Sequence, residues 1–188
     1  QAGISKYSDK MPTAGEQVWD DVDGADEGVT DLGGDNTLGY EMTMSGVTIS
    51  ASYARMGVGT DNSIVLIANE LVDGAEFGIG SGTNVISNTS EDDMTTVWGK
   101  YTTGPITFGV QLSEIDKTAA NTDVDREHAA ISFAVNENLS LSYGVSNVEY
   151  EATAKTDEES SGFSASYTMG GMTLGAVANK TDSLLGTA

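Results

Sequence analysis

The most constraining feature of the sequence is a hairpin pattern that recurs five times after residue 37. In each half of a unit, apolar residues alternate with small polar ones, and a short turn joins the two halves. Alternation at period two across a tight turn is typical of two antiparallel strands with one apolar face. The turns fall near residues 45, 73, 103, 137 and 170. We therefore expect an all-β fold, an antiparallel up-and-down meander of about ten strands.

Two of these units are alike in detail, which indicates an internal repeat of the hairpin. Residues 101–110 are Tyr-Thr-Thr-Gly-Pro-Ile-Thr-Phe-Gly-Val, and residues 167–176 are Tyr-Thr-Met-Gly-Gly-Met-Thr-Leu-Gly-Ala. Longer polar and acidic stretches separate the hairpins, and they are predicted to be loops: 57–62, 82–93, 116–127 and 151–161. Short turns at one end and long loops at the other are typical of a transmembrane β-barrel.

A soluble antiparallel sandwich would also alternate apolar and polar residues, so the alternation alone leaves both architectures open. The polar positions are mostly Ser, Thr and Gly, which suits a water-filled interior, and aromatic residues lie near the tight turns, as in a membrane barrel. The barrel predicts an outward-facing, exposed set: Val47, Ile49, Phe108, Val110, Leu139, Leu141, Met172 and Leu174. The alternative is a secreted, soluble β-protein that binds calcium or glycan through acidic loops.

Charge excludes some classes of function. The sequence has 8 Lys+Arg against 29 Asp+Glu, a formal net charge of −21. Nucleic acid is therefore not expected as a partner, because phosphate binding needs a basic surface. The sequence also has no cysteine, so it offers no disulfide, thiolate or cysteine-zinc chemistry. No apolar run approaches the ~18 residues of a transmembrane helix.

Catalysis finds little support in the residues. His128 is the only histidine and follows an acidic stretch, where a polar residue at a strand edge is the simpler interpretation. The sequence has no Gly-x-Ser-x-Gly nucleophile elbow, no phosphate-binding loop and no dinucleotide-binding glycine pattern. We predict that the chain is not an enzyme and needs no cofactor other than a possible calcium ion. An outer-membrane enzyme would require a polar cluster around His128.

The chain divides at residue 36. Residues 1–36 are acidic and glycine-rich with no sustained periodicity, whereas residues 37–188 carry the hairpins. A strandless stretch of this length is usually functional. In a barrel it could fold inward and narrow the channel, where rings of carboxylates favour cations. The predicted constriction residues are Asp20, Asp21, Asp23, Asp26 and Glu27, with Lys100 facing them from the wall.

The same acidic stretch has a second interpretation. Asp21, Asp23 and Asp26 surround Gly24, and hard cations such as calcium prefer several carboxylate oxygens on a turn. The stretch lacks the length and the closing glutamate of an EF-hand. A solvated external loop is the third possibility.

Several stretches resemble the general porins of alphaproteobacteria. They are the hairpins at 101–110, 136–145 and 162–179, and the opening run from Asp9 through Pro12 to Trp19 and Asp20. The opening run of this chain is similar to the third loop of those porins, which folds into the barrel. The resemblance spans essentially the whole chain.

The resemblance implies a transmembrane β-barrel of sixteen antiparallel strands, of which this chain would be a fragment with about ten. A closed ten-stranded barrel is the alternative, since even strand counts from eight upward occur. It further implies a homotrimer in the cell outer membrane, in contact with lipid and lipopolysaccharide. The expected function is passive diffusion of small hydrophilic solutes and ions, with a weak preference for cations.

Overall fold

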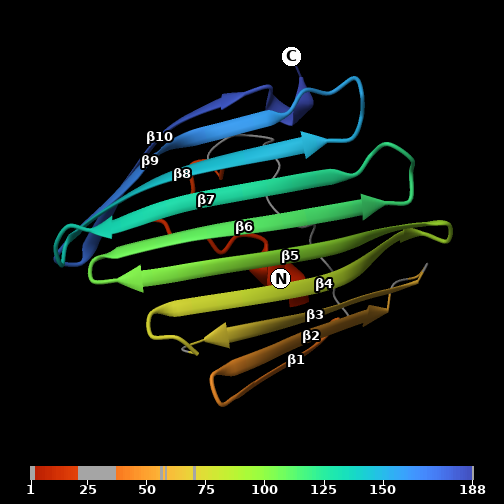
Figure 1. Ribbon diagram of the computed structural model, residues 1–188, viewed down its shortest axis with the longest axis horizontal. Coiled ribbons are helices and arrows are strands. Elements are labelled where there is room, and N and C mark those ends of the chain that lie inside the picture. The colour runs from red at the N-terminus through yellow and green to blue at the C-terminus, as the bar shows by residue number, and fades with distance from the viewer. Residues whose placement is uncertain (1–2, 21–36, 56, 58, 70, 188) are drawn as a thin grey trace.

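The computed structural model describes residues 3–20, 37–55, 57, 59–69 and 71–187. Within these residues, ten strands form one antiparallel sheet in which every strand pairs with the next one along the chain (Figure 1). The predicted up-and-down meander is confirmed. The strands are β1 (Thr37–Met44), β2 (Val47–Arg55), β3 (Thr60–Asn69), β4 (Ala75–Ser87), β5 (Ser90–Thr103), β6 (Ile106–Lys117), β7 (Val124–Ala134), β8 (Leu139–Tyr150), β9 (Glu158–Met169) and β10 (Met172–Asp182). Two 3-10 helices, η1 (Gly3–Tyr7) and η2 (Leu184–Gly186), lie before and after the sheet.

The short turns all lie at one end of the sheet, on the left in Figure 1. The turn between β1 and β2 consists of Ser45 and Gly46, both with positive φ, 52° and 78°. A two-residue hairpin turn with two positive φ angles matches the twist of the strands that it joins. Gly104 and Gly170, also at positive φ, occupy the turns before β6 and β10. This end is called the turn end, and the opposite end the loop end.

At the loop end the strands extend further than the sequence predicted. Residues 82–93 were expected to be a loop, but β4 runs to Ser87 and β5 starts at Ser90. Similarly, β6 continues to Lys117 and β7 starts at Val124. The prediction of long loops was wrong here because both faces of the strand ends carry polar residues. Strand pairing needs only backbone hydrogen bonds, whereas the sequence pattern depends on one apolar face.

One face of the sheet, the outer face, is apolar and exposed. Of the eight residues predicted to point outward, Phe108, Val110, Leu141, Met172 and Leu174 are exposed, and Val47, Ile49 and Leu139 are half-buried. They alternate with buried neighbours along each strand; β6, for example, alternates exposed and buried residues from Phe108 to Asp116. The orientation that the barrel requires is therefore present.

The other face, the inner face, carries polar residues that are largely buried. Its buried members include Ser50, Ser52, Ser63, Thr96, Gln111, Ser113, Ser142, Ser146, Ser160 and Ser164. Residues 3–20, called the inner segment, cover this face and bury Ile4, Tyr7, Met11, Val18 and Trp19 against it. The 3-10 helix η1, red in Figure 1, packs against β2, β3 and β4. The apolar core is therefore small and lies between the inner segment and the sheet.

The sheet is open among the described residues. β1 pairs only with β2 and β10 pairs only with β9, so each has one free edge. Neither helix of the described chain is long and apolar enough to cross a membrane.

Candidate functional site

The inner segment crosses the sheet nearly from edge to edge. At its start, the Ile4 N–H donates to Ser63 Oγ on β3, at 3.0 Å. In its middle, the Ala14 N–H donates to Ser142 Oγ on β8, also at 3.0 Å. At its end, Asn179 Nδ2 on β10 donates to the Val18 carbonyl at 2.6 Å. Inward-pointing serine and asparagine side chains from distant strands thus hold one continuous stretch of chain.

Gln111 on β6 is the principal anchor, and its side chain is fully buried. Its Oε1 accepts the Lys10 N–H at 2.7 Å. Its Nε2 lies 2.9 Å from the Tyr7 carbonyl oxygen and 3.1 Å from that of Ser8, and also 2.9 Å from Thr96 Oγ1 on β5. One amide therefore satisfies three backbone groups of the inner segment, which would otherwise be buried without partners.

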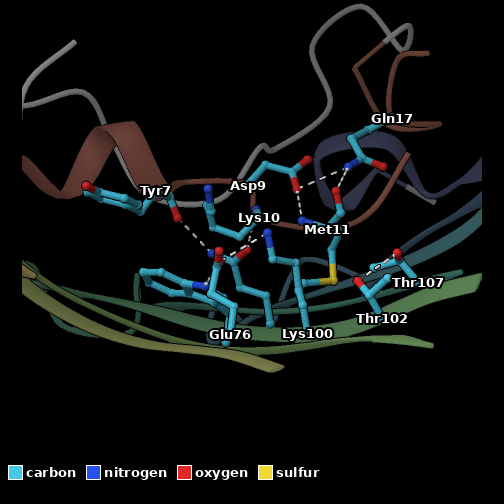
Figure 2. A network of polar contacts seen from close by, with 11 residues as sticks. Tyr7, Asp9, Lys10, Met11, Gln17, Glu76, Lys100, Thr102 and Thr107 are labelled. Carbon is cyan, nitrogen blue, oxygen red and sulfur yellow. Dashed lines mark hydrogen bonds and ion pairs between the residues drawn. The ribbon is translucent and has the colours of Figure 1, made fainter. Parts of the chain in front are cut away.

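Asp9 folds the inner segment back on itself. Its Oδ1 accepts the Met11 N–H at 2.9 Å and a longer bond from Gln17 Nε2 at 3.4 Å, while its Oδ2 accepts the Trp19 indole N–H at 2.8 Å. Gln17 also donates to the Met11 carbonyl at 2.7 Å, as Figure 2 shows. Burial of the carboxyl group raises the pKa of Asp9 to about 6, although its hydrogen bonds oppose that change.

Three lysines gather near the start of the inner segment, and two of them pair with carboxylates. Lys6 pairs with Glu41 at 2.7 Å, and Lys100 pairs with Glu76 at 3.0 Å. Lys10 lies close to the second pair (Figure 2), and burial together with the charge of Lys100 lowers its pKa. Two of the three positive charges of this cluster are therefore paired with carboxylates.

Aromatic rings secure both ends of the inner segment. Tyr7 stacks on Trp98 of β5 with ring centroids 5.5 Å apart, and the Trp98 indole N–H donates to Glu76 at 2.8 Å. Trp19 covers His128 of β7, with centroids 4.7 Å apart. His128 is buried beneath the inner segment, so the expectation of a strand-edge position was wrong. The ring that covers it lies more than a hundred residues away in the sequence.

An outward apolar face and an inward polar face covered by a chain segment are the features of a membrane channel. The sequence from residue 3 to residue 184 matches the family model for Gram-negative porins. The chain belongs to the Gram-negative porin family. Its place is therefore the outer membrane, and the soluble calcium- or glycan-binding alternative is excluded.

Solved structures share the fold of this porin. A porin structure refined at 1.8 Å is similar over 95% of this chain and 70% of that one, with 15% identity and a TM-score of 0.67. OmpT of Vibrio cholerae, folded in vitro, is similar over 78% of this chain with 16% identity and a TM-score of 0.61, and its trimer form gives 18% and 0.60. This chain spans about half the length of the OmpT chains, 53% and 54%. No curated protein matches the sequence.

The predicted constriction residues of the porin have different outcomes. Asp20 lies at the end of the described inner segment and is exposed, and its Oδ2 accepts the Gln17 N–H at 3.3 Å. Lys100 lies on the inner face, where Glu76 pairs with it and Lys10 of the inner segment lies nearby. Four of the predicted residues, Asp21, Asp23, Asp26 and Glu27, lie outside the described residues.

The proposed calcium ligands are among these last four residues. Within the described part of the porin, no group of three or more acidic or histidine side chains is arranged to hold a metal ion.

Sequence reasoning missed the residues that hold the inner segment, namely Asp9, Gln111, Trp19 and His128. Gln111 and His128 are large polar residues at inward positions where Ser, Thr and Gly are common, and that departure was the available signal. Asp9 offered no comparable signal, because its partners depend on how the inner segment folds.

Proposed function

We propose that this porin forms a water-filled channel through which small hydrophilic solutes and ions diffuse passively, and that the inner segment narrows it. The supporting observation is the inner segment itself: its backbone is hydrogen-bonded across a polar face whose reverse side is apolar and exposed. A segment packed on the lumen wall occupies part of the open cross-section. No covalent step or cofactor is needed for diffusion.

Swelling of proteoliposomes tests the diffusion function with the full-length porin. Vesicles that contain it should swell in sugars up to a sharp size limit, and heat-denatured porin should give no swelling. Equal swelling rates for all sugars up to large oligosaccharides would mean that nothing narrows the channel. Absence of swelling for every sugar would contradict diffusion itself.

A weak preference for cations is the finer part of the proposal. It is supported by the net charge of −21 and by exposed Asp20, which precedes six further acidic residues in the stretch up to residue 36. Lys100 does not oppose this charge strongly, because Glu76 pairs with it. A cluster of like charges in a channel with low-dielectric walls raises the local concentration of counter-ions.

Reversal potentials in planar bilayers test this preference. Substituting Asp20→Asn, Asp21→Asn and Asp23→Asn together should lower cation over anion permeability. The effect should fade at 1 M salt, where the Debye length is about 3 Å against about 10 Å at 0.1 M. The control has the same charge change in exposed turns and loops: Asp73→Asn, Glu137→Gln and Asp157→Asn. If both triple variants shift the reversal potential equally, the acidic stretch lies outside the conduction path.

Assembly and ion binding complete the proposal. We expect a homotrimer, and the trimer form of OmpT, which has a similar fold, supports this expectation. We also expect contact with outer-membrane lipid and lipopolysaccharide. We also propose that Asp21, Asp23 and Asp26 bind calcium weakly. Calorimetric titration of the porin with calcium should then show heat that disappears when the three residues are changed to Asn.

A further inference from the structure

Three glycines of the inner face lie directly beneath the inner segment. They occupy alternate strands: Gly80 on β4, Gly109 on β6 and Gly144 on β8. A Cβ atom placed on Gly80 would lie 3.3 Å from Ile4, one on Gly109 would lie 3.0 Å from Pro12, and one on Gly144 would lie 3.0 Å from Trp19. Each glycine therefore lies under a different part of the inner segment: its start, its middle and its end.

These distances are shorter than favourable carbon–carbon contacts, which lie at about 3.5–4.0 Å. Any side chain at these positions would push the inner segment away from the wall or force a neighbour to move. The rest of the surroundings leave little room: the same Cβ atoms would lie 3.0 Å from Val65 at Gly80 and 3.0 Å from Lys100 at Gly109. Glycine permits this close approach without displacement, whereas a Cβ atom requires a neighbour to move by a few tenths of an ångström.

Backbone conformation does not explain the three glycines. None of them has a positive φ, unlike Gly46, Gly74, Gly104 and Gly170 in the turns. A glycine inside a strand weakens it, and close approach of another backbone or ligand is the usual compensation. Here the approaching group is the inner segment.

Two other inner-face glycines provide the contrast. Gly39 on β1 pairs with Ser52, and Gly175 on β10 pairs with Ser166, which puts both in the inward phase of their strands. A Cβ atom on either would meet nothing within 4 Å. Inward glycines are therefore not all equivalent, and only the set beneath the inner segment contacts it.

We propose that Gly80, Gly109 and Gly144 form a seat that sets how far the inner segment projects from the wall, and hence the width of the channel. They are positioning residues, since they act on solutes only through the inner segment. The inference rests on the proposed function, because it requires that the inner segment narrows the lumen. It predicts that channel width decreases as the side chain at a seat position grows.

The experiment uses the full-length porin with Trp19 as its single tryptophan, every other tryptophan being changed to phenylalanine. Trp19 lies on Gly144 and is buried, so its emission reports whether the inner segment is seated. Gly144→Ala and Gly144→Val are compared with Gly175→Ala and Gly175→Val as matched controls. Single-channel conductance and acrylamide quenching of Trp19 are measured for each variant.

The seat predicts a red shift of Trp19 emission, stronger quenching and lower conductance, in the order glycine, alanine, valine. The Gly175 variants should match the parent in both measurements. Unchanged Trp19 emission in the Gly144 variants would overturn the seat. Displaced Trp19 with unchanged conductance would uphold the seat and instead contradict the proposed role of the inner segment as a constriction.

Folding is checked by the heat-dependent mobility of the porin in gel electrophoresis. If Gly144→Val does not fold, the triple variant Gly80→Ala, Gly109→Ala and Gly144→Ala replaces it, since alanine requires shifts of only a few tenths of an ångström. Trp19 emission in this folded variant equal to that of Gly39→Ala would overturn the proposal.

Discussion

The two faces of the sheet reverse the usual distribution of residues in a folded protein. On the outer face, Val110 is 58% exposed and Leu174 is 56% exposed, whereas on the inner face Gln111 and Thr96 have no exposed surface. In a soluble protein, large apolar residues are buried and amides mostly are not. The inner segment covers the polar face. In the proposed channel, lipid covers the apolar face, so the two faces have different partners.

Each partner imposes its own rule on the sequence. Lipid offers no hydrogen bonds, so the outer face must be apolar where it meets the hydrocarbon. The inner segment brings backbone N–H and C=O groups to the wall, so the inner face must offer hydrogen-bonding side chains of the right length at the right places. Substitutions on the outer face should therefore destabilise the porin by placing polar groups in hydrocarbon. Substitutions on the inner face should destabilise it by removing hydrogen bonds to the inner segment.

The largest effect is expected on the outer face. Val110→Arg places a charge in the middle of the apolar part of β6 and should destabilise the porin folded in bilayers by about 2–4 kcal/mol. Asp116→Arg, on the same strand and face but at the loop end, should cost only about 0–1 kcal/mol. Urea titrations in lipid vesicles measure both. Equal costs at the two positions would mean that Val110 does not face hydrocarbon.

A smaller effect is expected at the anchor of the inner face. Gln111→Ala leaves the Lys10 N–H and the Tyr7 and Ser8 carbonyls without their partner, at a cost of about 1–3 kcal/mol. Amide hydrogen exchange of residues 3–20 should accelerate while that of β6 should not. Ser113→Ala is the control, because Ser113 lies on the same strand and face and bonds to Thr96 of β5. If amide exchange of the inner segment is also faster in Ser113→Ala, Gln111 is not the specific anchor of that segment.

The smallest effect is a dependence on pH. Because the pKa of Asp9 is raised from 3.8 to about 6 in the folded porin, the seated segment binds a proton more tightly than the released one. Seating should thus be strongest below about pH 4, weaken as the pH rises to about 6, and stay constant above that value. Quenching of Trp19 followed from pH 4 to 8 measures this change. Asp9→Asn should remove the dependence on pH, and a dependence that persists would have another origin.

The strands of the sheet could be predicted from the sequence, because strand patterns depend on residues that are close together along the chain. Alternation and turn residues identified the strands and the orientation of Phe108 or Leu141 from neighbours along the chain. The contacts between the inner segment and the sheet could not be predicted, because they join residues that are far apart in the sequence. The Trp19–His128 contact and the anchoring by Gln111 depend on the path of the inner segment across the sheet, which has no periodicity from which to predict it. The balance of Lys100 by Glu76 depends on strand register, which pairs these two residues on β4 and β5.

The path of the inner segment also bears on the order of folding. Hairpin contacts such as Met169 with Met172 close within a few residues, whereas Thr13 approaches Ser142 across 129 positions and Asn179 reaches Val18 across 161. Contacts of large sequence separation form slowly, because the entropy of closing the loop is lost before any contact rewards it. The inner segment can complete its docking only after the sheet from β3 to β10 has assembled. The hairpins should therefore assemble first, and the channel should reach its final width in a late and separate kinetic phase.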